Sequence, residues 1–352
     1  MAKKYRNLIS LITDPANIRA AHDATARGRR NTQAYLSFKE YAPLNLDMLR
    51  DELVSGTYRP GPVREFLVHE PKPRLITALS FRDRVAQHAL VNIIGPIFEA
   101  TFLPRSYACR VGKGTHAGIK DLQAELRRMH KTGRPVYYLK TDFAKYFPSI
   151  DRSRLHAMIQ RKISCAATLR LIEAIVPPSG LGLPIGSLTS QLFANVYGGA
   201  VDRFFQCERG VKTWFRYMDD IVVLGFEQDA LLTLKADIQG FAHEALGLRF
   251  SKWRVAPVSR GINFLGYRIW PSHKLLRKDS VVRAKRRLKH LAAHGQGEDA
   301  MQFVAAWQGH AQWADTHNLR RTLNLAEGDV QWRAAGDMSC PESIGYDSRW
   351  WV

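Results

Sequence analysis

Apolar residues recur along this chain with two periods, one typical of helices and one typical of strands. Short apolar alternations over residues 63–78, broken by prolines, predict the two strands of a hairpin-like unit. Near-helical spacing over 83–98 predicts a helix that Pro96 interrupts, and an amphipathic pattern over 116–130 predicts another. The first 60 residues mix basic and polar side chains and predict helix, loop and helix.

The middle of the chain carries the clearest pattern of strands and helices. Residues 135–142 are rich in β-branched and aromatic side chains and predict a strand. Within 187–204, apolar residues at every fourth position predict one buried helical stripe: Leu188, Leu192, Val196, Ala200 and Phe204. Gly198 and Gly199 interrupt this helix, so we expect close packing against a backbone there. Residues 214–225 predict strand, tight turn and strand.

Length and composition indicate an ordinary globular protein. At 352 residues the chain suggests two or three units of about 150 residues each. No apolar run approaches the ~20 residues needed to cross a bilayer, and no secretory signal is visible, so we expect a cytoplasmic protein with no membrane partner. The four cysteines are widely spaced without a Cys-x-x-Cys pair, which argues against zinc and favours buried free thiols.

The charge balance adds the strongest compositional signal. A formal net charge of +20 implies a polyanionic partner, with nucleic acid as the leading candidate and an unrelated basic enzyme as the alternative. After a further predicted strand at 261–269, composition changes at Lys274 and a basic helical region begins. Its charges predict contacts with backbone phosphates, the alternative being a solvated helix face: Arg283, Lys285, Arg286, Arg287 and Lys289.

Three aspartates carry the most informative chemistry. Asp219 and Asp220 lie between two apolar, strand-forming flanks, where adjacent carboxylates repel each other unless cations intervene. An Asp-Asp pair in a solvated turn is common, so the pair alone decides little. Asp142 ends the strand 136–142, with Tyr138 and Lys140 on the same face. Three carboxylates from two strand ends predict a site for two Mg²⁺ ions and nucleotidyl transfer.

Two further segments are candidates for nucleotide contacts. The Gly/Pro-rich loop 182–191 contains Gly186, which would let a backbone approach a nucleotide closely, although a simple loop before a helix explains it equally well. Ser187 is a candidate N-cap for the following helix. Lys72 and Arg74 flank a proline on a short strand, where a guanidinium can clamp a triphosphate, although most such pairs are merely solvated.

The order of these segments resembles the palm motifs of reverse transcriptases. The resemblance rests on residues 139–151, the Gly/Pro loop, Tyr217-Met-Asp-Asp220 and Phe264-Leu-Gly-Tyr267. Within that superfamily, Leu183-Pro-Ile-Gly-Ser-Leu-Thr-Ser-Gln191 looks like the variant found in diversity-generating retroelements of the tropism-switching phage type. The resemblance covers roughly residues 1–320, and further segments similar to that family lie at 70–76, 81–90, 106–116, 195–203 and 257–267.

The resemblance implies an α/β (α+β) right-hand polymerase with an antiparallel palm sheet, helices around it and a helical thumb. The expected domains are an N-terminal segment with the fingers at 1–135, the palm at 136–270 with a fingers segment near 160–185, the thumb at 271–325, and a C-terminal tail of unknown role at 326–352.

The resemblance also implies roles for individual residues. The catalytic Asp142, Asp219 and Asp220 would hold two Mg²⁺ ions, which Mn²⁺ can replace, with the backbone carbonyl of Phe143 as a further ligand. Phe147 falls where an aromatic gate faces the ribose 2′-hydroxyl. Ile185 and Arg74 would determine fidelity, and Lys252 would assist pyrophosphate departure. The full expected nucleotide-binding set is Lys72, Arg74, Phe147, Ile185, Gly186, Gln191 and Lys252.

The implied function is mutagenic copying of RNA into DNA. Such an enzyme copies a template-repeat RNA into cDNA with errors at adenines, uses dNTPs, and works with a small helical accessory variability protein, expected to be homo-oligomeric. One alternative is a reverse transcriptase of a retron, a group II intron or a phage-defence system. An alternative of another class is a non-catalytic RNA-binding scaffold, against which the presence of all three aspartates argues.

Overall fold

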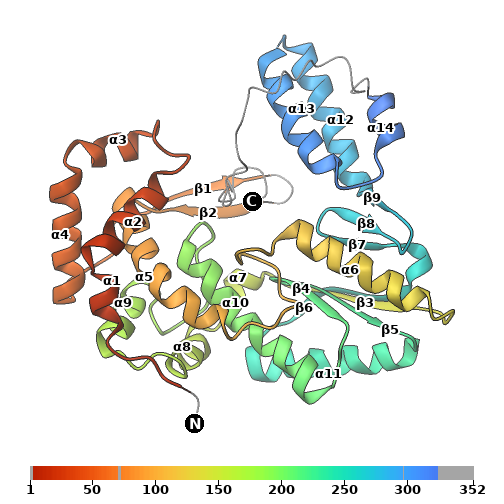
Figure 1. The fold of residues 1–352 in the computed structure, drawn as a ribbon, viewed down its shortest axis with the longest axis horizontal. Helices are drawn as coiled ribbons and strands as arrows, with labels where there is room; N and C mark the ends of the chain where they lie inside the picture. Colours follow the sequence, from red (N-terminus) through yellow and green to blue (C-terminus); the bar gives the residue numbers. More distant parts are fainter. Residues whose placement is uncertain (1–2, 70–72, 296, 324–352) are drawn as a thin grey trace.

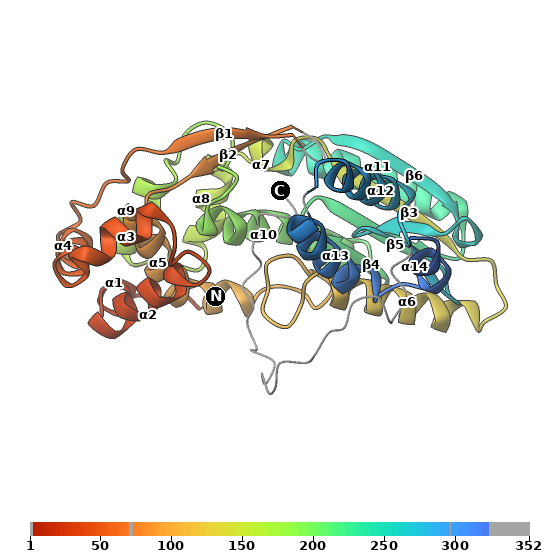
Figure 2. The same ribbon diagram turned by 90° about the horizontal axis from the view of Figure 1, so that it is seen from above.

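The structure of this chain is a computed structural model that describes residues 3–69, 73–295 and 297–323. It combines helices with three antiparallel sheets, which confirms the predicted mixture of helix and sheet. Helices α1–α4 lie at one end of the molecule in both Figure 1 and Figure 2, and the four-stranded sheet lies toward the other end. Helices α12–α14 stand beyond that sheet, with the small sheet β7–β9 between them (Figure 1).

The N-terminal helices pack around one long apolar helix, α5 (Phe81–Glu99). Helix α2 begins where the Asp14 side chain accepts a hydrogen bond from the Ala16 N–H. Helix α5 continues through Pro96, so the prediction that this proline interrupts it was wrong. One turn remains after Pro96, and tertiary packing holds it, because Ile97 and Phe98 are buried. The other helices are α1 (Leu8–Ile12), α2 (Pro15–Ala26), α3 (Gln33–Glu40) and α4 (Ala42–Ser55).

The predicted hairpin forms from β1 (Arg64–Val68) and β2 (Arg74–Ala78), which pair antiparallel with Val68 opposite Arg74. Strand β1 is largely exposed, whereas Ile76 and Thr77 of β2 are buried. The hairpin is fastened to the rest of the fold on the β2 side, where the Thr77 N–H donates to the Ile185 carbonyl at 2.8 Å. Lys72 belongs to the connection between the strands and lies outside the described residues.

The central sheet has the strand order β4-β5-β3-β6, and all its pairings are antiparallel. Alternate side chains enter two different hydrophobic clusters, one with α11 and α10 and one with α6 and the β7–β9 sheet. Because β3, β4 and β5 are covered on both faces, these strands are apolar along most of their length, whereas the edge strand β6 is exposed over Ser251–Arg254. The bounds are β3 (Tyr137–Phe143), β4 (Trp214–Tyr217), β5 (Asp220–Gly225), β6 (Phe250–Pro257), α6 (Thr115–His130) and α11 (Gln228–Leu246).

Helix α10 (Leu188–Arg203) crosses between the N-terminal helices and the sheet, and it continues as a π-helical turn over Phe204–Glu208. Ser187 is its N-cap, as predicted. The predicted stripe is not the most buried one, since Leu188, Leu192 and Ala200 are only half-buried. Phe193, Ala194, Tyr197 and Val201 are fully enclosed instead, because α5, α8 and α11 surround the helix on several sides.

Three short helices precede α10 and shape the loop that leads into it. Helix α7 (Tyr146–Ser149) follows β3 directly, and α8 (Arg152–Gln160) begins at the Asp151 N-cap. Helix α9 (Ala166–Ile175) packs against α1. The chain after α9 returns to α7, where the Leu183 N–H donates to the Phe147 carbonyl at 2.9 Å.

The segment 261–269 forms two strands rather than the single predicted strand. A tight turn at Leu265, with φ +50°, and Gly266 folds it into a hairpin. Gly266, with φ +88°, is a typical turn residue, but leucine rarely adopts the left-handed conformation of Leu265, which is why the apolar pattern of this segment predicts one strand. The elements from here on are η2 (Val258–Arg260), β7 (Ile262–Phe264), β8 (Tyr267–Ile269), β9 (Lys274–Leu276), α12 (Lys278–Ala293), α13 (Gly297–Ala311) and α14 (His317–Thr322).

The structure bears on two expectations from composition, the absence of a membrane-spanning helix and the burial of the cysteines. Among the described residues, no helix is both long and apolar enough to cross a membrane. The described cysteines are free, but only Cys165 is buried; Cys109 and Cys207 are exposed, so the prediction of buried thiols was wrong for these two. Cys340 lies outside the described residues.

Candidate active site

The three aspartates gather at one end of the central sheet. Asp142 on β3 and Asp220 on β5 are direct partners in the antiparallel register. Asp219 lies in the turn between β4 and β5, next to Met218, whose φ of +53° is a left-handed conformation. A non-glycine residue rarely adopts that conformation unless its surroundings impose it. Two strand ends and one strained turn therefore bring the three carboxylates together.

The pKa values of the clustered aspartates are shifted by burial and by repulsion between their carboxylates. Burial and the nearby charge of Asp142 raise the pKa of Asp219 to about 7, and the positive charge of Arg74 opposes this rise. Burial also raises the pKa of Asp220, against the effect of Lys140. Carboxyl groups in such a state gain stability from a nearby cation. The influence of Arg74 on Asp219 also indicates that the end of β2 lies close to the cluster.

The donor set fits a hard divalent ion, since carboxylate oxygens are its preferred ligands. Within the described part of the chain, however, no three acidic, histidine or cysteine side chains converge tightly enough to coordinate one ion as they stand. Protein donors hold two of the carboxylates instead. The Ser251 hydroxyl lies 2.6 Å from Asp142 Oδ2, and Lys140 Nζ lies 2.6 Å from Asp220 Oδ1. An ion would compete with these hydrogen bonds.

The Gly/Pro loop lies against the β1–β2 hairpin. Gly186 has φ +110°, and a Cβ added to it would lie 2.7 Å from the Thr77 carbonyl oxygen. Only glycine fits there without a backbone shift. The close neighbour of Gly186 is thus strand β2, where the sequence had suggested an approaching nucleotide. Ile185 is half-buried beside the same strand.

Several other predicted nucleotide contacts border the cluster. Phe147 is half-buried on α7, directly after β3, and packs edge-on against Tyr146. Lys252 is exposed on β6 and is the register partner of Asp142. Gln191 is half-buried in the first turns of α10. The pairing of β3 with β6 shifts register between Asp142 and Phe143, the residue whose carbonyl was predicted as a ligand.

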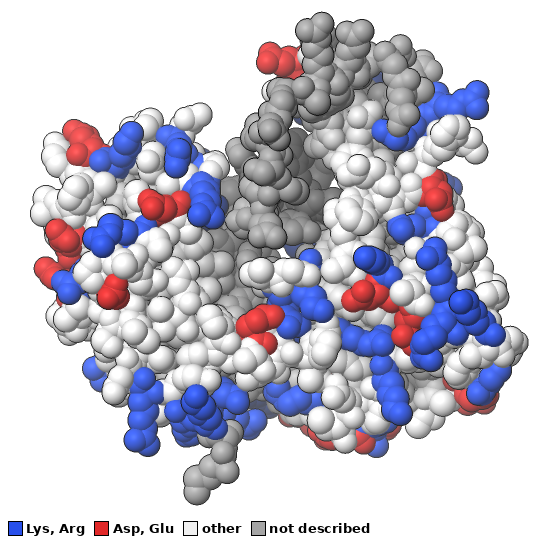
Figure 3. All heavy atoms as spheres, in the orientation of Figure 1, with Lys and Arg blue, Asp and Glu red and all other residues white. Residues whose placement is uncertain are grey.

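The predicted nucleic-acid contacts form a separate group on α12. All five side chains are exposed, while Ala284 and Leu291 of the same helix are buried, so the helix presents its basic side to solvent: Arg283, Lys285, Arg286, Arg287 and Lys289. Figure 3 shows Lys and Arg side chains distributed widely over the face drawn there, in line with the net charge of +20. The positive charge of Arg277, just before α12, lowers the pKa of Asp220 and so counteracts part of the rise caused by burial. The start of α12 therefore acts electrostatically on the aspartate cluster.

Sequence reasoning missed a buried ionic network behind the Met218 turn. Arg216 on β4 is fully buried and donates to both carboxylate oxygens of Asp202 on α10, each at 2.7 Å. It also donates to the Ser106 hydroxyl at 2.8 Å and to the Met218 carbonyl at 3.3 Å. The last contact joins the network to the turn that carries Asp219. An arginine inside an apolar strand was the available signal, because such a charge requires a partner.

Gly198 on α10 makes room for this network. A Cβ at Gly198 would lie 2.6 Å from Arg216 Nη1 and 2.8 Å from the Tyr146 hydroxyl oxygen. The close packing predicted for the glycines is therefore present at Gly198, but against two side chains rather than a backbone. The Tyr146 hydroxyl in turn donates to the Ala194 carbonyl at 2.7 Å.

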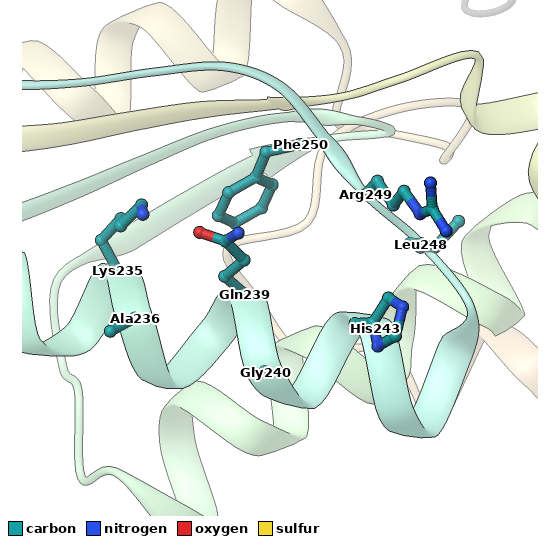
Figure 4. Close-up of a pocket in the computed structure, with 8 residues that line it drawn as sticks. All are labelled: Lys235, Ala236, Gln239, Gly240, His243, Leu248, Arg249 and Phe250. Atoms are coloured by element: carbon teal, nitrogen blue, oxygen red, sulfur yellow. The ribbon is translucent and has the colours of Figure 1, made fainter.

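A pocket of about 580 Å³ lies elsewhere, between the second half of α11 and the start of β6 (Figure 4). Its lining combines the basic side chains of Lys235, His243 and Arg249 with the Phe250 ring. It shares no residue with the predicted site.

The chain is similar in sequence to known bacterial proteins. The chain is 24% identical over 335 residues to Protein YkfC of Escherichia coli strain K12, covering 79% of this chain and 84% of that protein. It is 27% identical over 165 residues to the group II intron-encoded protein LtrA of Lactococcus lactis subsp. cremoris, covering 43% of this chain and 26% of LtrA. The chain thus spans about a quarter of the length of that intron protein.

Among solved structures, the apo telomerase of Candida tropicalis truncated from its C-terminal domain matches with a TM-score of 0.45 and 12% identity, covering 61% of this chain and 55% of that one. The family model for "Reverse transcriptase (RNA-dependent DNA polymerase)" matches residues 68–269, which include all three aspartates, the Gly/Pro loop and strand β2. Since this match spans more than half of the chain, the protein belongs to the reverse transcriptase family, and the prediction of an RNA-directed DNA polymerase is confirmed at that level.

Proposed function

We propose that this chain synthesises DNA on an RNA template with two divalent metal ions held by Asp142, Asp219 and Asp220, Mg²⁺ being the natural ion and Mn²⁺ a substitute. The observation that carries the proposal is the register of β3 and β5, which sets Asp142 opposite Asp220 beside the turn with Asp219. Bound ions would activate the primer hydroxyl and stabilise the departing pyrophosphate. The carbonyl of Phe143 is the proposed additional ligand.

The residues around the cluster receive the nucleotide in this proposal. Arg74, whose charge already acts on Asp219, binds the triphosphate together with Lys72. Phe147 contacts the sugar, where its ring excludes a 2′-hydroxyl. Lys252, opposite Asp142 in the register, assists pyrophosphate departure. The incoming nucleotide and the template base are contacted from one side by Ile185, Gly186 and Gln191.

We assign the parts of a right hand accordingly. The fingers comprise residues 1–135 with a segment near 160–185, the palm comprises 136–270, and the thumb comprises 271–325. The four-stranded sheet with α11 corresponds to the palm, and α12–α14 correspond to the thumb. The tail 326–352 lies outside the described residues.

The basic side of α12 binds the phosphates of the template–product duplex in this arrangement. Replacing Arg283, Arg286 and Arg287 together with Gln is expected to weaken duplex binding. It should also reduce the slope of log affinity against log salt by about 2 to 3, since each phosphate contact contributes about 0.9. Binding titrations at several salt concentrations measure this slope. Lys39→Gln on α3, an exposed charge at the other end of the molecule, is the control and should leave it unchanged.

For the biological role we propose a diversity-generating retroelement, in which a template-repeat RNA is copied with adenine-directed errors and an accessory, homo-oligomeric protein takes part. The support is the sequence of the loop Leu183–Gln191, in which Ile185 lies beside β2. The second candidate is a reverse transcriptase of group II intron type, which the similarity to LtrA favours.

Sequencing of the cDNA made on an RNA template, with Mg²⁺ present, tests this choice. Errors are expected to cluster opposite template adenines, and Ile185→Gln should reduce them severalfold. Leu181→Gln, a change at an exposed position directly before this loop, is the control and should leave the error pattern as it is. Uniformly accurate cDNA would favour the intron-type enzyme, and a failure to make any cDNA would contradict the polymerase assignment itself.

A further inference from the structure

Lys140 occupies an unusual place for a cation, because it lies within the aspartate cluster. It precedes Asp142 by two residues on β3 and lies on the same face of the sheet. Its partner in the register is Val222, so its side chain reaches diagonally across to β5, where Nζ lies 2.6 Å from Asp220 Oδ1. Both side chains of this ion pair are only 25% exposed.

The ammonium group is held from other sides as well. Nζ donates to the Asn263 carbonyl oxygen at 2.5 Å, and it lies 5.6 Å from the centre of the Phe264 ring. Phe264 is itself buried in the β7–β8 hairpin, so this anchor is fixed. A carbonyl oxygen and an aromatic face both attract a cation. Lys140 is therefore bound to the β7–β8 hairpin independently of Asp220, unlike a freely moving surface lysine.

We propose that Lys140 is a positioning residue that acts as a built-in counter-cation. It holds Asp220 while no metal ion is bound, and it competes with the incoming ion for Asp220 Oδ1. When the ion takes that oxygen, the ammonium stays at Asn263 and Phe264. This inference rests on the proposed metal site. Its consequence is that Lys140 sets how much divalent metal the enzyme requires, because binding of the ion and the Lys140–Asp220 contact oppose each other.

The test is direct binding of Mn²⁺ to the metal-stripped protein, measured from the electron paramagnetic resonance signal of free Mn²⁺. Lys140→Met keeps the apolar stem and removes the charge. It is expected to tighten Mn²⁺ binding by roughly three- to tenfold, the size of a partly exposed ion pair and of a typical coupling between sites. The same variant should gain more than the wild type in thermal midpoint when Mn²⁺ is added, since its metal-free state has lost the counter-cation.

Two comparisons separate this effect from a general loss of charge. Lys235→Met removes a lysine that stacks on Trp253 and is expected to leave Mn²⁺ affinity unchanged. In an Asp220→Asn background, Lys140→Met should change the affinity by less than about twofold, because the two residues act through one contact. A full effect of Lys140→Met in that background would overturn the inference.

Other outcomes distinguish this inference from the proposed function. If Asp142→Asn weakens Mn²⁺ binding but Lys140→Met leaves it unchanged or weaker, the role of Lys140 is wrong and the metal site stands. If the wild type binds no Mn²⁺, or if Asp142→Asn has no effect, the metal site fails and this inference fails with it. Lys140→Gln provides the same comparison if Lys140→Met does not fold.

Discussion

Asp219→Ala is expected to lower the rate of primer extension on an RNA template by about a thousandfold, the upper end of the loss typical when a group that stabilises transition-state charge is removed. The backbone turn that carries Asp219 is constrained, because Met218 next to it is left-handed and the Arg216 guanidinium donates to the Met218 carbonyl. Single-turnover extension with saturating dNTP measures the chemical step. Asp47→Ala, at an exposed position on α4, is the control and should retain full activity.

The same substitution should not destabilise the fold, and this separates catalysis from structure. Asp219 has its pKa raised to about 7, so in the metal-free protein its charged form is less favourable when folded than when unfolded. The folded state bears the full cost above about pH 7, and the cost disappears progressively as the pH falls from about 7 to about 4, the ordinary pKa of an aspartate. Asp219→Ala removes it, so the thermal midpoint of metal-free protein at pH 8 should be equal or higher. An unchanged extension rate would exclude Asp219 as a metal ligand.

Local sequence signals were sufficient for the parts of the site that lie close together along the chain. Asp219 and Asp220 are adjacent, and strand propensity on both sides of them predicts the hairpin that the structure contains. Asp142 could be added because it ends a strand of the same type. What remained open was the register, since a shift by one residue would have turned Asp142 away from Asp220.

The contacts that support the cluster depend on distant parts of the chain and could not be predicted. Lys140 meets the carbonyl of Asn263, 123 residues away, because β7 folds beside the sheet. Arg216 meets Asp202 only because α10 crosses behind β4 at Gly198, where the missing side chain leaves room for the guanidinium. The apolar pattern of α10 predicted a stripe of residues that is not the most buried one, since a helix enclosed on several sides has no single apolar face.

The Arg216–Asp202 pair should dominate the stability of this region. Asp202→Ala is expected to lower the free energy of unfolding by about 3–5 kcal/mol, because it leaves the fully buried guanidinium without its carboxylate. Thermal and urea denaturation followed by circular dichroism measure the change. Glu227→Ala removes the exposed partner of Arg134 and should cost no more than about 1 kcal/mol. A similar cost for both variants would mean that burial of the pair has no energetic consequence.

A double variant distinguishes the two roles of this ion pair. Asp202→Leu combined with Arg216→Met replaces the pair by apolar side chains, and it should recover much of the stability that Asp202→Ala loses, since buried pairs are often no more stabilising than apolar packing. It cannot restore the hydrogen bond from Arg216 to the Met218 carbonyl, which holds the turn of Asp219. Stability should therefore return while primer extension remains impaired. Recovery of both together would mean that the arginine serves the fold alone and that the Met218 turn positions Asp219 without it.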